Sequence, residues 1–458
     1  GTWALQSAGH IGEPLSSDAI MRAWPGASGR PVTSSDTCKG FYGREAEMER
    51  IEQSLLAPDR PQSIMVFGQR RVGKTSTLLE LARSYPPRNG SLTAAFLDIA
   101  DLRIPPTGGM ASAFYEKILS AIESGSMNEH IRKVLRERCG HRLVISRLVK
   151  RANPEISFSD AMERLVDKLS EYSGGVIDRV AFLIDEFDRF VEPLLTGRKD
   201  EVDKLMWGLR QVVQMSRKIG LVLAGSGLQR LFTEDYQDPL FGSIEGVELG
   251  PFSLQGEREA VKNTFMPPEV RYRLCRDEDF EGLTDHAYAL CGGHPWFLSM
   301  LGYSAAVACR GRTLNRSLLN HIVGMIISGE LKHEAVAIDA GRFYKQSVFE
   351  ALHVLDRRGR AVSVITLAHV AQIASTEYPW VSVMDAIQAP DLLRLTTERE
   401  RLDALQLLEK IQVIEKNAPD AKVRIRIPLT GRALRSDAFV IRQEALADLM
   451  ELGGGPRQ

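Results

Sequence analysis

Residues 63–81 carry a spacing suited to binding phosphate groups. Gly68 and Gly73 frame four residues, and Lys74 and Thr75 follow at once. The glycines allow the backbone to approach a phosphate, so that successive N–H groups form an anion-binding nest. Lys74 adds positive charge, and the Thr75 hydroxyl is placed for a magnesium ion that bridges the outer phosphates. The loop therefore predicts a nucleoside triphosphate site made of Gly68, Gln69, Arg70, Arg71, Val72, Gly73, Lys74, Thr75 and Ser76.

The sequence around this loop favours that interpretation over a simple glycine-rich turn. An apolar run at 64–67 precedes the loop, and Leu78, Leu79 and Leu81 follow it at spacings that suit a buried helix face. A strand, a glycine-rich loop and a helix in this order are the context that the phosphate-binding pattern requires.

A second group of polar residues ends the apolar run at 180–184. Asp185 is placed to hold magnesium together with Thr75, and Glu186 to polarise a water molecule that attacks the terminal phosphate. Lys74, Asp185 and Glu186 are thus the predicted catalytic residues. An ordinary surface cluster of acids is the alternative, which the presence of the phosphate loop disfavours. Asp188 is interpreted as a helix cap.

Ser226 follows a third apolar run, at 221–224. Ligands gather at the carboxyl edge of open α/β sheets, so the Ser226 hydroxyl is a candidate to contact the attacking water or the terminal phosphate. A turn formed by residues 225–227 explains the same residues equally well, and the sequence leaves the two interpretations open.

These groups require a scaffold that brings strand ends together. Apolar runs at 63–67, 92–99, 180–184, 221–224 and 247–249 alternate with helical or loop segments, which predicts an α/β fold with a mainly parallel sheet. After Pro251 the expected elements are helices at 254–265, 277–290, 295–308 and 316–331. Further helices are expected at 343–355, 364–373 and 397–408, followed by a hairpin over 413–427, an order that suggests a winged helix.

The predicted domain organisation has five parts. An extended or disordered lead-in covers 1–37, the nucleotide-binding domain 38–252, a helical lid 253–337, the winged helix 338–450 and a flexible tail 451–458. No internal repeat of solenoid period is present.

The amino-acid composition argues against a zinc-binding or membrane-spanning protein. The 458 residues are 44% hydrophobic, and 58 basic against 59 acidic side chains leave a net charge of -1, so no global field attracts nucleic acid. The five cysteines lack zinc-site spacing and favour reduced thiols. No apolar run is long enough to span a bilayer, which predicts a cytoplasmic protein without a membrane partner.

Taken together, residues 38–335 resemble the STAND class of signal-transduction ATPases and the similar archaeal-type ATPases of the AAA+ division. The resemblance includes Phe41–Glu45, the family's adenine-side motif, and residues 292–295, similar to the Gly-x-Pro element that opens the lid helix. It implies strand order 5-1-4-3-2, ATP or ADP with Mg²⁺ as cofactors, and nucleotide contacts from Tyr42, Arg44 and Pro295. A helix stop and restart explains residues 292–295 about as well.

The sequence departs from the family pattern by lacking an arginine in the predicted lid helix. Motors of this division carry an arginine in the lid helix that senses the terminal phosphate, and residues 295–308 contain none. The resemblance therefore implies slow hydrolysis, or sensing by another arginine. Arg210 and Arg230 are candidates for a finger that reaches the phosphate of a neighbouring subunit, although a solvated helix face explains such arginines more simply.

Two clusters of basic residues raise the possibility of a DNA partner. Residues 132–151 are rich in arginine and lysine, although a solvated helix face explains this more simply. In the predicted hairpin, Lys422, Arg424 and Arg426 share one face that would suit a DNA backbone. The charges of the preceding helix are mixed, which favours a packing role over sequence reading.

Two functions from different classes follow. The first is a regulatory ATPase switch that couples ADP or ATP binding to domain opening and to association with itself or with an effector protein. The alternative is a DNA-binding initiator or mobile-element ATPase whose winged helix grips duplex DNA. The near-neutral net charge favours the first.

Overall fold

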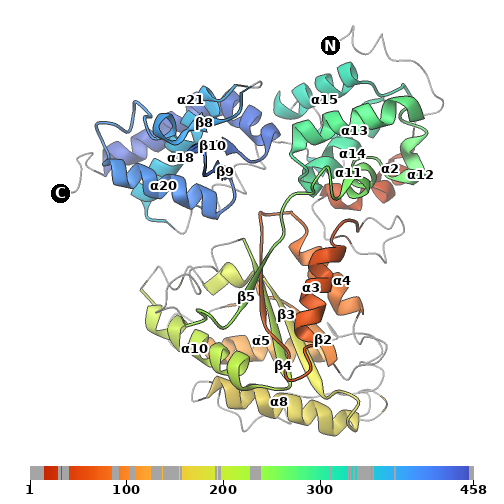
Figure 1. Ribbon diagram of the computed structural model, residues 1–458, viewed down its shortest axis with the longest axis vertical. Helices are drawn as coiled ribbons and strands as arrows, with labels where there is room; N and C mark the ends of the chain where they lie inside the picture. The colour runs from red at the N-terminus through yellow and green to blue at the C-terminus, as the bar shows by residue number, and fades with distance from the viewer. Residues whose placement is uncertain are drawn as a thin grey trace. The chain divides into compact units, whose positions relative to one another are not determined.

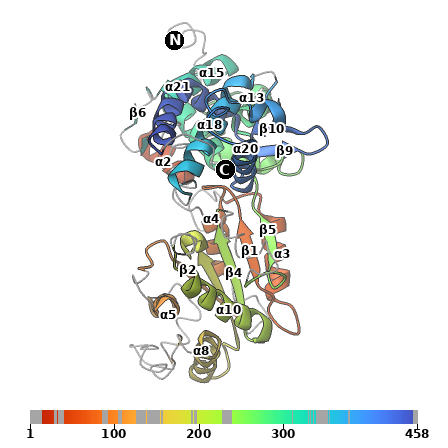
Figure 2. The same cartoon turned by 90° about the vertical axis from the view of Figure 1, so that its left-hand side faces the viewer.

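The computed structural model of the 458-residue chain is shown in Figures 1 and 2. It describes residues 15–28, 32, 41–84, 92–103, 109–124, 137, 154, 157–190, 193, 197–226, 239–309, 311–328, 330, 332–333, 336–337, 352, 355–375 and 378–452. The basic segment 132–151, with only residue 137 described, Arg230 and most of the expected helix at 343–355 lie outside these residues.

The chain folds into two compact units. One comprises Arg44–Gly68 and Lys74–Leu249 and is called the sheet unit below. The other, the helical unit, comprises Gly1–Gly43, Gln69–Gly73 and Gly250–Gln458. The five-part domain organisation remains a prediction.

The sheet unit is built on five parallel strands in the order β2-β3-β4-β1-β5, which confirms the predicted fold class and strand order. Figure 2 shows β2 at one edge and β5 at the other. The strands are β1 (Ile64–Phe67), β2 (Leu92–Asp98), β3 (Arg179–Asp185), β4 (Ile219–Gly225) and β5 (Glu245–Glu248). All of β4 and nearly all of β3 is buried, as expected for strands covered on both faces.

Helices cover both faces of this sheet (Figure 1). On one face α4 (Lys74–Ser84) packs on β2, β3 and β4. On the other, α10 (Lys199–Met215) packs against α5 (Met110–Ser124) and α8 (Phe158–Ser173). This division follows from right-handed crossovers, because the chain moves along the sheet in opposite directions from β1 to β2 and from β2 to β3.

The register of the strands brings their polar ends to one edge. Phe67, at the end of β1, pairs with Gly225 at the end of β4, and Ile184 of β3 pairs with Leu223. The phosphate loop, Asp185 and Ser226 each lie at the end of one of these three strands or directly follow it. The sheet topology thus places at one edge features from three separate parts of the sequence.

In the helical unit, the four helices predicted after Pro251 are present. They are α11 (Arg258–Phe265), α13 (Asp277–Cys291), α14 (Pro295–Cys309) and α15 (Arg316–Ser328), with the short α12 (Pro268–Arg271) between the first two. Helix α14 is apolar almost all round and nearly every residue is buried, so it forms the centre of this group.

The lead-in differs from the prediction of an extended or disordered segment. Ser17–Ala23 forms helix α2, capped by the Ser16 hydroxyl, and Pro25–Ser28 forms a 3-10 turn. Trp24 between them is 1% exposed and its indole N–H donates to the Phe265 carbonyl at 3.0 Å. The segment lacks a sustained apolar period and gives no sign of this in the sequence, although Ile20, Ala23, Trp24 and Ala27 are all buried.

The C-terminal part contains the predicted hairpin as β9 (Ile414–Asn417) and β10 (Lys422–Ile425), joined by β8 (Val381–Ser382) in an antiparallel sheet. The helices are α18 (Arg357–Ile373), α19 (Val383–Ala386), α20 (Glu398–Lys410) and α21 (Pro428–Glu451). Helix α21 was not expected from the sequence. Its apolar residues are spread around the helix, and it packs along α18 and against α13.

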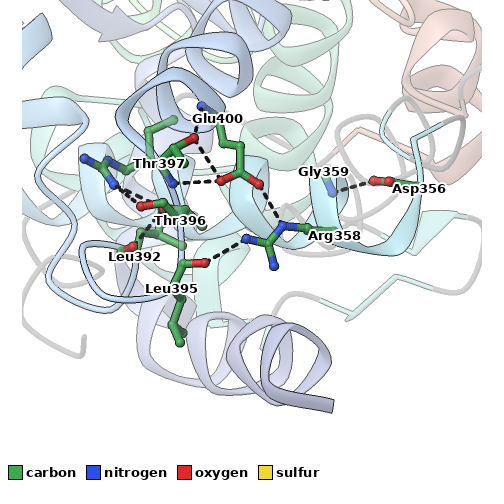
Figure 3. A network of polar contacts seen from close by, with 9 residues as sticks. Asp356, Arg358, Gly359, Leu392, Leu395, Thr396, Thr397 and Glu400 are labelled. Atoms are coloured by element: carbon green, nitrogen blue, oxygen red, sulfur yellow. Dashed lines mark hydrogen bonds and ion pairs between the residues drawn. The ribbon is translucent and has the colours of Figure 1, made fainter. Parts of the chain in front are cut away.

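The start of α20 is fixed by a polar network (Figure 3). Thr397 and Glu400 form a capping box, in which each side chain accepts a hydrogen bond from the other's backbone N–H. Arg358 of α18 donates to the Glu400 carboxylate at 2.7 Å and to the Leu395 carbonyl at 2.7 Å. These bonds tie α20 to α18.

Among the helices of the described residues, none combines the length and apolarity that crossing a lipid bilayer would require.

Candidate nucleotide-binding site

The two ends of the phosphate loop are bonded within the sheet unit. The Lys74 ammonium group donates to the Gly68 carbonyl at 2.9 Å, which closes the loop on itself. The Thr75 hydroxyl donates to the Asp185 carboxylate at 2.5 Å. Thr75 stands in the first turn of α4 and Asp185 at the end of β3. Tertiary structure thus brings together the two residues that the sequence predicts as a magnesium pair.

Asp185 lies in an environment with opposing electrostatic effects. Its side chain is buried, and desolvation raises the pKa of its carboxyl group above the usual value. The Thr75 hydrogen bond, the Lys74 charge and the Glu186 N–H act in the opposite direction. A divalent cation at this carboxylate would add a further and stronger effect in favour of the ionised form.

Glu186 has a strained backbone. Its φ is +58°, in the left-handed region that costs a non-glycine residue about 1–3 kcal/mol. This conformation turns the chain directly after β3 and leaves the Glu186 side chain exposed beside the buried Asp185. Strain of this kind gathers at functional sites, so the observation supports the predicted role of Glu186 in activating water.

Ser226 is held through its backbone. Its N–H donates to the Asp188 carboxylate, which joins the ends of β4 and β3. Asp188 lies inside the 3-10 turn Phe187–Phe190 and bonds Ser226, in place of the helix cap predicted for it. The role of the Ser226 hydroxyl toward a phosphate stays a prediction.

The middle of the loop is bonded within the helical unit. The Gln69 N–H donates to Gln412 Oε1 at 3.0 Å, and the Gln69 side-chain amide donates to the Gln412 carbonyl. His294 Nε2 lies 3.2 Å from the Arg70 carbonyl. The Arg71 guanidinium lies 4.5 Å from the centre of the Trp296 ring, a cation–π contact. Three consecutive loop residues therefore have partners from distant parts of the sequence.

The loop backbone itself contains two left-handed residues. Gly73 has φ +109° and Arg71 has φ +62°. Gly73 meets the need for glycine that the motif predicts. Arg71 has a side chain that the left-handed conformation disfavours, and its contact with Trp296 helps to hold this conformation.

Residues 292–295 end one helix and begin the next. Gly292 caps α13 with φ +59°, and Pro295 is the first residue of α14. Gly293 has φ +75°, and a Cβ there would lie 2.1 Å from the Phe252 carbonyl oxygen. This supports the stop-and-restart interpretation. A contact between Pro295 and a nucleotide stays a prediction, and the residues that bond the loop are His294 and Trp296 on either side of it.

The adenine-side residues have structural partners of their own. Arg44 is 3% exposed and pairs with Glu47 at 3.0 Å. Gly43, with φ +67°, lies so close to α11 that a Cβ would approach the Ala260 methyl to 2.5 Å. The nucleotide contacts predicted for Tyr42 and Arg44 are not tested by this arrangement.

Two of the basic residues considered for DNA or for a finger role, Arg424 and Arg210, have partners within the protein. Arg424 bonds Glu415 across the hairpin and lies 4.5 Å from the Trp380 ring centre. Lys422 is exposed. Arg210 donates to the Pro239 carbonyl at 2.9 Å and contacts the Trp207 ring. Pairing with Glu415 reduces the charge that Arg424 offers to a phosphate.

Comparison with known families agrees with this geometry. Residues 40–221 match the family model described as an AAA ATPase domain, and they include the phosphate loop, Asp185 and Glu186. The chain contains an AAA+ P-loop ATPase domain. The chemistry of such a domain is the binding of ATP and its hydrolysis to ADP and phosphate.

Solved structures extend the likeness beyond this domain. A Walker-type ATPase of Pyrococcus abyssi is 20% identical, with a TM-score of 0.57 over 89% of this chain and 98% of its own. The Aeropyrum pernix ORC2 protein, solved as ADPNP-ADP complexes, is 15% identical, with a TM-score of 0.49 over 89% and 96%. The Aeropyrum pernix ORC1 protein in complex with DNA is 16% identical, with a TM-score of 0.35 over 93% and 98%.

The first of these likenesses shows a common fold, and the other two scores are too low to support an inference. No curated protein matches the sequence.

Three residues that contact the phosphate loop, His294, Trp296 and Gln412, were not predicted as site residues. His294 and Trp296 flank Pro295, so the glycine-proline element gave a signal for their location although not for their contacts. Gln412 gave none, because a glutamine at the end of a helix 343 residues from its partner has no recognisable pattern.

Proposed function

We propose that this AAA+ ATPase works as a regulatory switch of the STAND kind, in which ADP and ATP stabilise different conformations and thereby control self-association or binding of an effector protein. The C-terminal part, with α18, α19, α20 and the hairpin β9–β10, serves as a winged helix in this proposal. Its three-stranded antiparallel sheet and helix order are compatible with that fold.

The proposal rests above all on how the phosphate loop is held. Gly68 and Lys74 group with the sheet unit, whereas Gln69–Gly73 group with the helical unit. Because the loop is continuous, a nucleotide that fixes its ends also acts on the residues that bond its middle. A ligand changes a conformational equilibrium only through differential contacts with the two states, and a loop divided in this way offers such contacts.

The residues present fit a magnesium ion. The Thr75 hydroxyl and the Asp185 carboxylate meet at the end of β3, and both are the hard oxygen ligands that magnesium prefers. Thr75 and Asp185 would hold it, and the ion would neutralise charge on the outer phosphates.

The protein residues have separate roles in the proposed hydrolysis. Lys74, released from the Gly68 carbonyl, offsets charge on the terminal phosphates. The loop N–H groups bind the same oxygens. Glu186 accepts a proton from the attacking water, and its exposed position beside Asp185 suits that task. Helix α14 contains no arginine to sense the terminal phosphate, which favours slow turnover and hence a switch.

The experiment compares the full chain with ADP, with ATP and without nucleotide. Nucleotide content is measured after purification, and mass is measured in solution with each ligand. We expect bound ADP in the purified protein and a larger assembly with ATP. A monomer that carries no nucleotide and keeps its mass when ATP is added would contradict the switch.

A DNA-binding initiator is the weaker candidate. Lys422 is exposed on the hairpin, but the Arg424 charge is paired with Glu415. Salt-dependent binding of duplex DNA that is lost on charge reversal of Lys422 would favour this second function.

A further inference from the structure

Helix α20 ends at a residue type that is unusual for its backbone conformation. The N–H of Gln412 bonds the Glu409 carbonyl at 2.8 Å, and the N–H of Val413 bonds the Leu408 carbonyl at 2.9 Å. These two bonds are a Schellman motif, in which the residue after the C-cap adopts the left-handed conformation. That residue is Gln412, with φ +60°.

Glycine is the residue that this position favours, since it has no Cβ to strain the left-handed backbone. Two other helix ends illustrate this: α13 ends at Gly292 with φ +59°, and α8 at Gly174 with φ +64°. Gln412 keeps a strained conformation at a place where glycine would relieve it. The contacts of the Gln412 side chain therefore bear on why this strain is tolerated.

The partner of the Gln412 side chain is the phosphate loop. Its Oε1 accepts the Gln69 N–H at 3.0 Å, while its backbone carbonyl accepts the Gln69 side-chain amide. Both residues are buried, at 5% and 9% exposure. The left-handed backbone turns both the Gln412 carbonyl and the Gln412 side chain toward Gln69. The strained conformation is therefore the one that makes both hydrogen bonds.

We propose that Gln412 is a positioning residue for the phosphate loop, which slows the release of bound nucleoside diphosphate by fixing the second residue of the loop.

The physical reason is preorganisation. Phosphate-binding N–H groups bind strongly when they converge before the ligand arrives, because ordering them on binding costs conformational entropy. Gln412 fixes the chain at Gln69, directly before the segment whose N–H groups form the nest. His294 and Trp296 contact the next two residues, so loss of Gln412 frees the first of three consecutive attachments.

The role rests on the proposed function only in requiring that the loop binds a nucleoside diphosphate. It deepens that function, since it makes nucleotide retention depend on a residue at the end of α20.

The test uses the full chain and the fluorescent diphosphate mant-ADP with magnesium. Dissociation rates are measured for the wild type and for Gln412→Ala, Gln412→Gly and Gln412→Glu, and thermal unfolding is measured for each protein. Gln406→Ala is the matched control, since Gln406 is an exposed glutamine on the same helix.

The three variants separate the side-chain contact from the stability of the helix end. Gln412→Gly removes Oε1 but relieves the backbone, so we expect mant-ADP to dissociate about 5- to 10-fold faster although the unfolding temperature is equal or higher. Gln412→Ala should accelerate dissociation equally and unfold at a lower temperature. Gln412→Glu keeps an acceptor for the Gln69 N–H but places a negative charge beside the phosphate loop, so it should release mant-ADP faster than the wild type while the Gln69 amide stays bonded.

Hydrogen exchange supplies a second readout. Exchange of the Gln69 amide should accelerate in Gln412→Ala and Gln412→Gly and remain slow in Gln412→Glu and Gln406→Ala.

Two outcomes would overturn the positioning role. One is wild-type retention of mant-ADP by Gln412→Gly, because the effect in Gln412→Ala would then come from the helix end. The other is exchange of the Gln69 amide in Gln412→Glu as fast as in Gln412→Ala. A wild type whose mass is indifferent to ATP would refute the switch and leave the positioning role standing, whereas a wild type that binds no mant-ADP would refute both.

Discussion

The ends and the middle of the phosphate loop are held by different means. Gly68, Lys74 and Thr75 bond one another or Asp185, all within the sheet unit. Gln69, Arg70 and Arg71 bond or contact Gln412, His294 and Trp296, all within the helical unit. The ends carry groups with the chemistry for phosphate and metal, whereas the middle is held through backbone groups and two side chains of the loop.

This difference suggests that the ends of the loop bind and hydrolyse the nucleotide, whereas the middle controls how long the nucleotide stays bound. Removal of a group at the ends should abolish binding or turnover, because nothing else supplies its charge or proton transfer. Removal of a partner of the middle should change how long nucleotide stays bound, since the chemical groups remain. Four predictions test this division.

The largest effect is expected at Glu186. Glu186→Gln should lower the rate of ATP hydrolysis by about 10²- to 10⁴-fold, the usual contribution of a general base, and leave ADP affinity unchanged. Steady-state phosphate release and equilibrium binding measure the two quantities. Glu186→Gly offers a further check: it should be equally inactive yet unfold at a higher temperature, because it relieves the strain at φ +58°. Full activity of either variant would remove Glu186 from the mechanism.

Lys74→Ala should weaken ADP binding by about 100-fold, because a charged hydrogen-bond donor to phosphate is lost. Calorimetric titration measures the affinity. Lys199→Ala is the control, since Lys199 is an exposed lysine at the start of α10 in the same unit. Unchanged affinity in Lys74→Ala would mean that the ends of the loop do not carry the binding chemistry.

His294→Ala removes a partner of the loop's middle. We expect ADP affinity to fall by about 5-fold, the value of one hydrogen bond, while the maximal hydrolysis rate changes little. His294→Gln can still donate to the Arg70 carbonyl and should restore part of the affinity. If His294→Ala instead abolished hydrolysis with normal affinity, the contrast between ends and middle would be wrong.

Glu400 should produce the smallest effect, because it stabilises α20 and lies on neither part of the loop. The hydrogen bond from Arg358 lowers the pKa of Glu400 below its unfolded value of 4.5, so the stabilisation is present above that pH and is lost as pH falls through the folded-state pKa. Glu400→Gln should cost less than about 1 kcal/mol at neutral pH and flatten the acid dependence of thermal unfolding. Its mant-ADP dissociation rate at pH 7 should equal that of the wild type. A faster rate would connect the whole of α20, and not Gln412 alone, to the loop.

The strands and the phosphate loop could be predicted from the sequence, because each has a pattern of residue types within a short segment. The five apolar runs became the five strands, and the order 5-1-4-3-2, implied by the family resemblance, is confirmed. Thr75 and Asp185 were predicted as a pair and they bond. The segment around Trp24 and helix α21 were missed, because the first has only a few scattered apolar residues and the second lacks a clear apolar face.

The sequence by itself determined the phosphate loop, the acidic residues that end β3 and the parallel sheet, because glycine spacing, charge and apolar runs act over a few residues. Only the tertiary structure decided what holds the middle of the loop. Apart from the Arg71–Trp296 contact, the contacts that hold it join a backbone group to a side chain more than two hundred residues away. The sequence does not show which partner a backbone N–H or carbonyl will meet.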